Sequence, residues 1–346
     1  MKQKNIKNSK IIRLASLCLV AVMAVFMLAA CSTSTTSGTS TTDEATKKSL
    51  TIGVIQYISH PSLDNCYNGI EAALKADKNL DVTIDRQIGS DTSADADCAS
   101  YASNMVSKNY DMIIAIATPA ATSAFAATED SDIPVIFCAV SDPVAAELVQ
   151  SMEKPGDLCT GTSDVLNLDA QVDLIQSMQP DVKSIGVLYT TSEANSITQL
   201  NNLKEICEKR NLKVEASGVQ NAADIPSAAS ALCGKVDCLN NFTDNNIVNN
   251  LSVVLEAANG ANIPVYGSEV EQVKNGCLAA VSIDYVELGK TTGNMAIDVL
   301  NGGDIKTMAV KTISDATPVI NTDVTKTLSI TVPDKYKDAE TVKTNK

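Results

Sequence analysis

The sequence has few of the residues that catalysis by a nucleophile or a metal ion would need. Among its 346 residues there is no Trp and only one His, His60. A Ser/His/Asp triad, a Cys/His pair or a Cys/His metal site cannot be defended from a single histidine. We therefore expect a protein that is not an enzyme and that holds no metal ion and no cofactor.

Positive charge is also scarce. The chain has 27 Lys and Arg against 41 Asp and Glu, and five of the positive residues lie in its first 30 positions, so residues 31–346 keep 22 and carry a net charge of −19. A protein that binds nucleic acid needs a basic surface for the phosphate backbone. We expect no nucleic-acid partner.

The first 30 residues have the three parts of a secretory signal. Basic residues are followed by the apolar run 14–28 and then by small residues that end immediately before Cys31. This junction resembles the bacterial lipobox, which predicts that residues 1–30 are removed and that Cys31 carries a lipid. The alternative is an ordinary cleaved signal with an incidental cysteine. The Ser/Thr-rich segment 31–49 is predicted to tether a domain to the extracytoplasmic face of the membrane.

The chain has ten cysteines, of which Cys18 lies in the leader and Cys31 is the predicted lipid site. The other eight fall in or beside apolar strand-like runs and on helical stretches, where a free cysteine behaves as a small hydrophobic residue. We interpret most of them as reduced core residues.

From residue 49 onward, short runs rich in Ile and Val alternate with longer amphipathic segments. This alternation predicts an α/β fold of two Rossmann-like lobes with parallel sheets. The predicted strands are 50–56, 82–85, 112–116, 135–138, 184–189, 212–216, 236–239, 264–266 and 278–281. The predicted helices are 61–76, 94–108, 120–128, 143–152, 195–210, 224–233, 245–259, 269–274 and 286–301.

Ligands of doubly wound sheets bind beyond the carboxyl ends of the strands, and the residues that follow these predicted strands are polar. Thr118, which Pro119 follows, stands where one helix is predicted to begin. Ser141 or Asp142, just before Pro143, stands where another is predicted to begin. Free backbone amides there could bind a carboxylate. The plainer interpretation is that these residues only cap helices.

The other predicted strand ends combine hydroxyl, amide, acidic and aromatic groups, a mixture that favours a zwitterion. The candidate ligand-binding residues in these loops are Tyr57, His60, Glu193, Asn195, Phe242, Asp244, Glu269, Asp284 and Tyr285. Phe242 follows a strand in a polar loop and could form a pocket wall with the tyrosines, or be a loop anchor that turns inward. His60 could touch the ligand, cap the following helix or lie on the surface.

Several of these segments, in this order, resemble the substrate-binding lipoproteins of ABC importers of the tryptophan/tyrosine-type family, which have the type I periplasmic-binding fold. The similarity covers about residues 50–335. It depends on the segments 56–64, 115–121, 139–144, 161–164, 188–196, 243–245, 274–276 and 283–289. The resemblance implies a hinged clamp, with residues 50–161 and 284–317 in the N-lobe and residues 162–283 and 318–340 in the C-lobe.

The resemblance also implies a function for the cleft. Thr118 and Ser141 would bind the carboxylate of an amino acid, Glu269 and Asp244 would bind its ammonium group, and the solute, an aromatic amino acid, would pass to a membrane permease. A monomer is expected. The open alternatives are a sugar or nucleoside as the solute, and a lipoprotein that senses a ligand for a membrane receptor.

Overall fold

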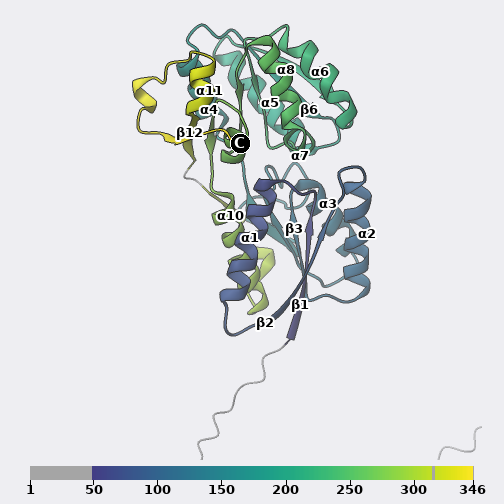
Figure 1. The fold of residues 1–346 in the computed structure, drawn as a ribbon. Helices are drawn as coiled ribbons and strands as arrows, with labels where there is room; N and C mark the ends of the chain where they lie inside the picture. Colours follow the sequence, from purple (N-terminus) through teal and green to yellow (C-terminus); the bar gives the residue numbers. More distant parts are fainter. Residues whose placement is uncertain (1–48, 314–315, 346) are drawn as a thin grey trace, which may run out of the picture. The chain divides into compact units, whose positions relative to one another are not determined.

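The computed structural model describes residues 49–313 and 316–345. The predicted signal peptide, Cys31 and the predicted tether up to residue 48 lie outside this range. The described residues form two α/β lobes, and α10 (Tyr285–Leu300) belongs with the first lobe although most of the second lobe precedes it in sequence (Figure 1). No helix in 49–313 or 316–345 is long and apolar enough to cross a membrane.

The first lobe is built on a six-stranded parallel sheet in the order β11-β5-β4-β3-β1-β2. Its central strands are runs of buried apolar residues, as a sheet covered on both faces requires. The strands are β1 (Ser49–Gln56), β2 (Asp81–Ile88), β3 (Met112–Ile116), β4 (Val135–Cys138), β5 (Cys159–Ser163) and β11 (Lys311–Thr312). The helices are α1 (Pro61–Ala76), α2 (Ala94–Ser107), α3 (Thr118–Thr128) and α10 (Tyr285–Leu300).

The second lobe has a parallel sheet in the order β7-β6-β8-β9 and a smaller sheet in the order β10-β12-β13, in which β10 and β12 are antiparallel. The strands are β6 (Ser184–Thr190), β7 (Lys213–Val219), β8 (Cys238–Asn240), β9 (Val265–Tyr266), β10 (Ala279–Ser282), β12 (Thr317–Asn321) and β13 (Glu340–Val342). The helices are α4 (Leu168–Met178), α5 (Ala194–Lys209), α6 (Ile225–Cys233), α7 (Asn245–Asn249), α8 (Leu251–Ala261), α9 (Val270–Lys274) and α11 (Thr322–Thr327). The α/β fold with two parallel-sheet lobes is therefore confirmed.

Two apolar clusters fill each lobe, one on each face of its main sheet. In the first lobe, α1 packs so closely on α10 that only glycine fits at the contact. A Cβ atom on Gly69 would lie 2.1 Å from the carbonyl oxygen of Val286, and one on Gly289 would lie 2.1 Å from that of Cys66. The eight cysteines of the described residues are all buried and free.

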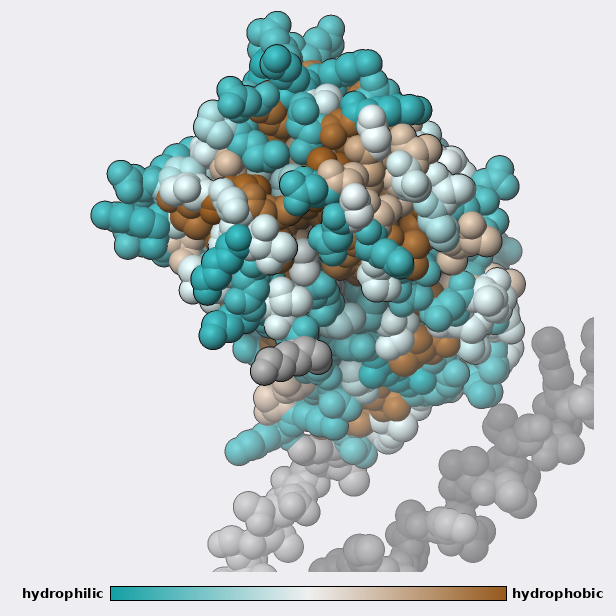
Figure 2. Space-filling view, turned by 45° about the horizontal axis from the view of Figure 1, so that its top comes forward, coloured by the Kyte–Doolittle hydropathy of each residue, from teal (hydrophilic) through white to brown (hydrophobic). Residues whose placement is uncertain are grey.

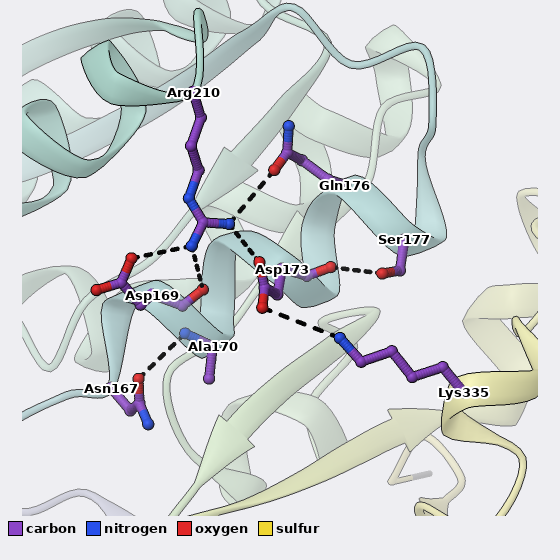
Figure 3. Close-up of polar contacts among 8 residues, drawn as sticks. All are labelled: Asn167, Asp169, Ala170, Asp173, Gln176, Ser177, Arg210 and Lys335. Atoms are coloured by element: carbon purple, nitrogen blue, oxygen red, sulfur yellow. Dashed lines mark hydrogen bonds and ion pairs between the residues drawn. The ribbon is translucent and has the colours of Figure 1, made fainter.

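Arg210, at the end of α5, joins this helix to α4, and α4 in turn contacts the C-terminal segment (Figure 3). Its guanidinium group forms ion pairs with Asp169 and Asp173 of α4, and Asp173 is also 3.9 Å from Lys335. The side chains of Asp169 and Lys335 are more than half exposed, and that of Asp173 is about half exposed. We therefore expect each ion pair to contribute little to stability. Figure 2 shows a face of the molecule that is mostly hydrophilic, with apolar residues in small separate areas.

The predicted helix over 143–152 is wrong, because this segment is a series of turns. Glu147 has a φ of 58°, in the left-handed region that a right-handed helix cannot contain, and the amides of both Leu148 and Val149 bond to the carbonyl of Pro143. The prediction also omitted β5, α4 and β12. The sequence of β5, Cys-Thr-Gly-Thr-Ser, contains too few apolar residues to be recognised as a buried strand.

Candidate ligand-binding site

A pocket lies where the strand-end loops of the two lobes meet, and its empty volume is about 350 Å³ when the open solvent at its mouth is included. Direct hydrogen bonds cross between the lobes at this point. His60 Nε2 lies 3.3 Å from Asn245 Oδ1, and Gln199 Nε2 donates to the Oγ of Ser141 at 2.9 Å. The Ser141 and Thr243 hydroxyls lie 3.4 Å apart. The two lobes thus form one polar site.

Half of the predicted residues line this pocket. They are His60, Thr118, Ser141, Asn195, Glu269 and Tyr285, and all six are buried. Ser141 comes from the loop after β4, and the other five come from helix starts or from the residue just before them, as the rule for doubly wound sheets predicts. The helix α3 begins at Thr118 itself, after Ala117, so the Thr118 hydroxyl does not cap it and is free for other contacts.

Two predicted residues have structural roles within the second lobe instead. Phe242 is fully buried in an apolar cluster, so the alternative of an inward-turned loop anchor describes it and the predicted pocket wall does not. Asp244 is fully buried and caps α7, accepting hydrogen bonds from the Ile247 amide at 3.0 Å and from the Thr190 and Ser196 hydroxyls at 2.8 and 2.7 Å. The Thr190 amide is a fourth donor, at 2.5 Å, so each carboxylate oxygen of Asp244 already accepts two hydrogen bonds and no position is left for a ligand ammonium.

The other four predicted residues also lie outside the pocket lining. Asp142 accepts a hydrogen bond from the Ala145 amide, and Asp284 is exposed and caps α10. Tyr57 is half-buried against the core of the first lobe. Glu193 is buried one step behind the pocket, where its carboxylate accepts hydrogen bonds from Asn195 and Asn245.

The sequence interpretation missed several residues that line the pocket, chiefly Ser62, Asp164, Thr243, Asn245 and Gln272. Asp164 accepts hydrogen bonds from Ser141 Oγ and from the Tyr285 hydroxyl, both at 2.9 Å, and burial raises its pKa. It ends a segment that carried the family resemblance, and Asn245 directly follows Asp244. Motif membership and adjacency were therefore signals that could have found these two residues.

The pocket is acidic, since Asp164 and Glu269 line it and no Lys or Arg among the described residues does. Glu269 is 1 % exposed and caps α9, accepting hydrogen bonds from the amides of Glu271 at 2.6 Å and Gln272 at 2.7 Å. Burial raises its pKa to about 7, and burial together with the nearby Asp244 raises the pKa of Glu193 to about 8. A cation at Glu269 would stabilise the charged carboxylate.

The first lobe contributes unpaired backbone donors. The helices α1 and α3 are preceded by His60 and Ala117, and neither helix has a side-chain cap. Ser62, Leu63 and Thr118 line the pocket, and their backbone amides have no hydrogen-bond acceptor among the described residues. Helix N-termini with free amides attract anions, so this side of the pocket suits a carboxylate.

Residues 51–343 match the family of ABC transporter substrate binding proteins. The chain belongs to this family. The substrate-binding protein is 40% identical, over 288 residues and 82% of each chain, to a tyrosine-binding protein of Clostridioides difficile strain R20291. These two matches confirm the family expected from the sequence. Proteins of this family bind small solutes outside the cytoplasm for a membrane permease.

Two solved structures extend the comparison. A domain from Streptococcus pneumonia in complex with L-Trp has a TM-score of 0.80, is 35% identical and covers 85% of the substrate-binding protein and all of its own chain. A ligand-free, open substrate-binding protein with adhesive properties from Clostridium difficile is 37% identical. The match covers 86% of the present chain and 100% of that chain, with a TM-score of 0.65. At similar identity, the substrate-binding protein is therefore closer in structure to the L-Trp complex.

Proposed function

We propose that this substrate-binding protein binds an aromatic amino acid in the pocket between its lobes and delivers it to a membrane permease. The observation that carries the proposal is the opposition of charge across the pocket. Glu269 is a buried carboxylate, no Lys or Arg in 49–313 or 316–345 lines the same pocket, and the uncapped starts of α1 and α3 offer free amides there. An α-amino acid has an ammonium group for the first and a carboxylate for the second.

The nature of the side chain is inferred from relatives and from the remaining lining. The L-Trp complex and the tyrosine-binding protein both point to an aromatic ring. Leu63, Val248 and Tyr285 give the pocket an apolar part against which a ring can pack. Thr118 and Ser141 are proposed to assist in binding the carboxylate.

A thermal-shift screen tests the proposal. A ligand that binds only the folded protein raises its melting temperature, so the purified protein is heated with each of the twenty amino acids, several sugars and several nucleosides. We expect stabilisation by aromatic amino acids. Stabilisation by sugars or nucleosides alone would contradict the proposed pocket chemistry, and titration calorimetry with the active compounds then gives their affinities.

The way the protein is held at the membrane is a separate proposal. We propose that Cys31 carries the lipid and that the segment up to residue 49 is the tether. The test is a Cys31→Ala variant expressed in a bacterium that processes lipoproteins. We expect this variant to be lost from the membrane fraction, while the unaltered protein stays there; equal membrane retention of the two would contradict lipid attachment at Cys31.

A further inference from the structure

Four buried polar atoms on residues that line the pocket have no hydrogen-bond partner among the described residues. One is the Ser62 hydroxyl oxygen, which can donate as well as accept. The other three are His60 Nδ1, Asn195 Oδ1 and Gln272 Oε1, on side chains that are 8 %, 3 % and 1 % exposed. Buried polar atoms in proteins are nearly always paired, because an unpaired one loses its bond to water without replacement. Each of these atoms therefore marks a position where a ligand can supply a donor.

The amide groups of Asn195 and Gln272 are oriented by acceptors behind the pocket. Asn195 Nδ2 donates to the carbonyl oxygen of Thr243 at 3.1 Å and to Glu193 Oε2 at 3.2 Å. Gln272 Nε2 donates to the carbonyl oxygen of Phe242 at 3.1 Å. A carbonyl oxygen can only accept, so the NH₂ groups must face these atoms and the amide oxygens must be the free ends.

The same logic determines the tautomer of His60. Asn245 Nδ2 donates to Glu193 Oε2 at 2.7 Å, which leaves its Oδ1 to face His60 Nε2 at 3.3 Å. Nε2 must then carry the hydrogen. Burial lowers the pKa of His60 to about 4, so the ring is neutral at neutral pH and has one N–H only. Nδ1 is consequently an acceptor without a hydrogen.

These three acceptors fall into two groups. The backbone amide of Gln272 donates to Glu269, so Gln272 belongs to the part of the pocket proposed for the ligand ammonium. His60 and Asn195 meet instead through Glu193 and Asn245, since both asparagines donate to the same Glu193 oxygen and Asn245 accepts from His60. With the ammonium at Glu269, the His60 and Asn195 acceptors still require a donor from the rest of the ligand.

We propose that His60 Nδ1 and Asn195 Oδ1 accept a hydrogen bond from the side chain of the ligand, so that the protein selects aromatic amino acids that carry a ring O–H or N–H. This inference rests on the proposed function. Tyrosine and tryptophan have such a donor and phenylalanine has none. A site built to hydrogen-bond a substrate rejects the analogue that leaves its buried groups unpaired, and we expect a preference of about 10- to 100-fold.

The test compares ligands that differ only in the donor. Titration calorimetry with the unaltered full-length protein uses L-tyrosine against L-phenylalanine, and L-tryptophan against β-(3-benzothienyl)-L-alanine, in which sulfur replaces the ring N–H at nearly the same shape. We expect the donor-bearing member of one or both pairs to bind at least about tenfold more tightly. Discrimination in one pair only would support the inference and identify the donor as the phenol or the indole.

The outcomes separate this inference from the proposed function. Equal affinities within both pairs would overturn the inference and leave the binding of aromatic amino acids intact. Failure of all four compounds to bind would overturn both.

Variants then assign the discrimination to these residues. His60→Phe removes the acceptor and is expected to abolish the preference for the donor-bearing ligand, mainly by weakening its binding. His60→Asn places an amide oxygen near the position of Nδ1 and is expected to keep part of the preference. Asn195→Leu is expected to act as His60→Phe does, whereas Asn201→Leu, on an exposed position of the same helix, is the matched control. An undiminished preference in both His60→Phe and Asn195→Leu would contradict the assignment.

Discussion

The two lobes present opposite chemistry to the pocket through the starts of their helices. In the first lobe, α1 and α3 begin without a side-chain cap, and the backbone amides of Ser62, Leu63 and Thr118 have no acceptor in the part of the chain that the structure describes. In the second lobe, α7 and α9 begin with carboxylates that already accept from their own helix amides. Helix starts that look equivalent in sequence therefore make a donor surface in one lobe and an acceptor surface in the other. A ligand must satisfy both, so a zwitterion suits the site.

On the acceptor side of the pocket, the largest loss of ligand affinity is expected from replacing Glu269. Glu269→Ala should weaken binding of the aromatic amino acid by about 2–4 kcal/mol, because the ligand ammonium would be buried without its partner. Titration calorimetry measures the loss. Glu271→Gln, which alters a partly exposed carboxylate of the same short helix, is the matched control and should keep the affinity. Unchanged affinity in Glu269→Ala would remove Glu269 from the site.

The first lobe, which carries the donor side, contains the close contact of α1 with α10. Gly69→Ala should lower the free energy of unfolding by about 1–3 kcal/mol, because the added methyl group meets the carbonyl of Val286 and the backbone must shift. Gly260→Ala provides the contrast, since nothing lies within 4 Å of a Cβ atom at that helical position. It should stabilise the protein by about 0.4–1 kcal/mol. Urea unfolding measures both, and equal effects would contradict the close contact.

A milder change on the donor side is Thr118→Val, which keeps the shape and the backbone amide and removes the hydroxyl. We expect binding to weaken by about 1–2 kcal/mol through one lost hydrogen bond. The same calorimetric titration checks this, and the melting temperature of the free variant serves as its control. A loss as large as that of Glu269→Ala would show that the first lobe contributes more through side chains than we propose.

The smallest expected effect is the dependence of ligand affinity on pH. The pKa of Glu269 in the free protein is raised to about 7 by burial, and the ligand ammonium needs the ionised form. Affinity should therefore fall about threefold between pH 7.5 and pH 6.5, and binding near pH 7 should release protons, which calorimetry in buffers of different ionisation enthalpy detects. Glu269→Gln should remove this dependence. Retention of the full pH profile in that variant would assign it to another group.

The raised pKa of Glu269 also affects the stability of the free protein. Ligand affinity increases as the pH rises, whereas the contribution of Glu269 to stability decreases. Between about pH 4.5, where an unfolded Glu titrates, and about pH 7, the folded protein binds more protons at Glu269 than the unfolded chain does. The Glu269 contribution to stability is thus fully present below this window and is lost as the pH rises through it. Bound ligand, by pairing with the carboxylate, should reduce this loss.

Much of the fold could be predicted from residue patterns. The helix at 61–76 and the strands at 112–116 and 135–138 agree with the structure at both ends, because each has strong local signals, a proline at the first turn or a short run of buried apolar residues. The errors fall where local signals are weak. The strand β5 is polar, and the apparent helix after Pro143 is interrupted at Glu147 by a positive φ.

For the site, the sequence by itself determined the fold class, the family and the kind of residue that follows each strand. Only the tertiary structure decided which of these residues reach the ligand. Asp244 and Glu269 look alike in sequence, since both precede short helices and both cap them. Thr190 and Ser196 satisfy Asp244 from neighbouring segments, whereas Glu269 faces the pocket. Capping and ligand binding use the same residue types, and long-range packing determines which role each residue has.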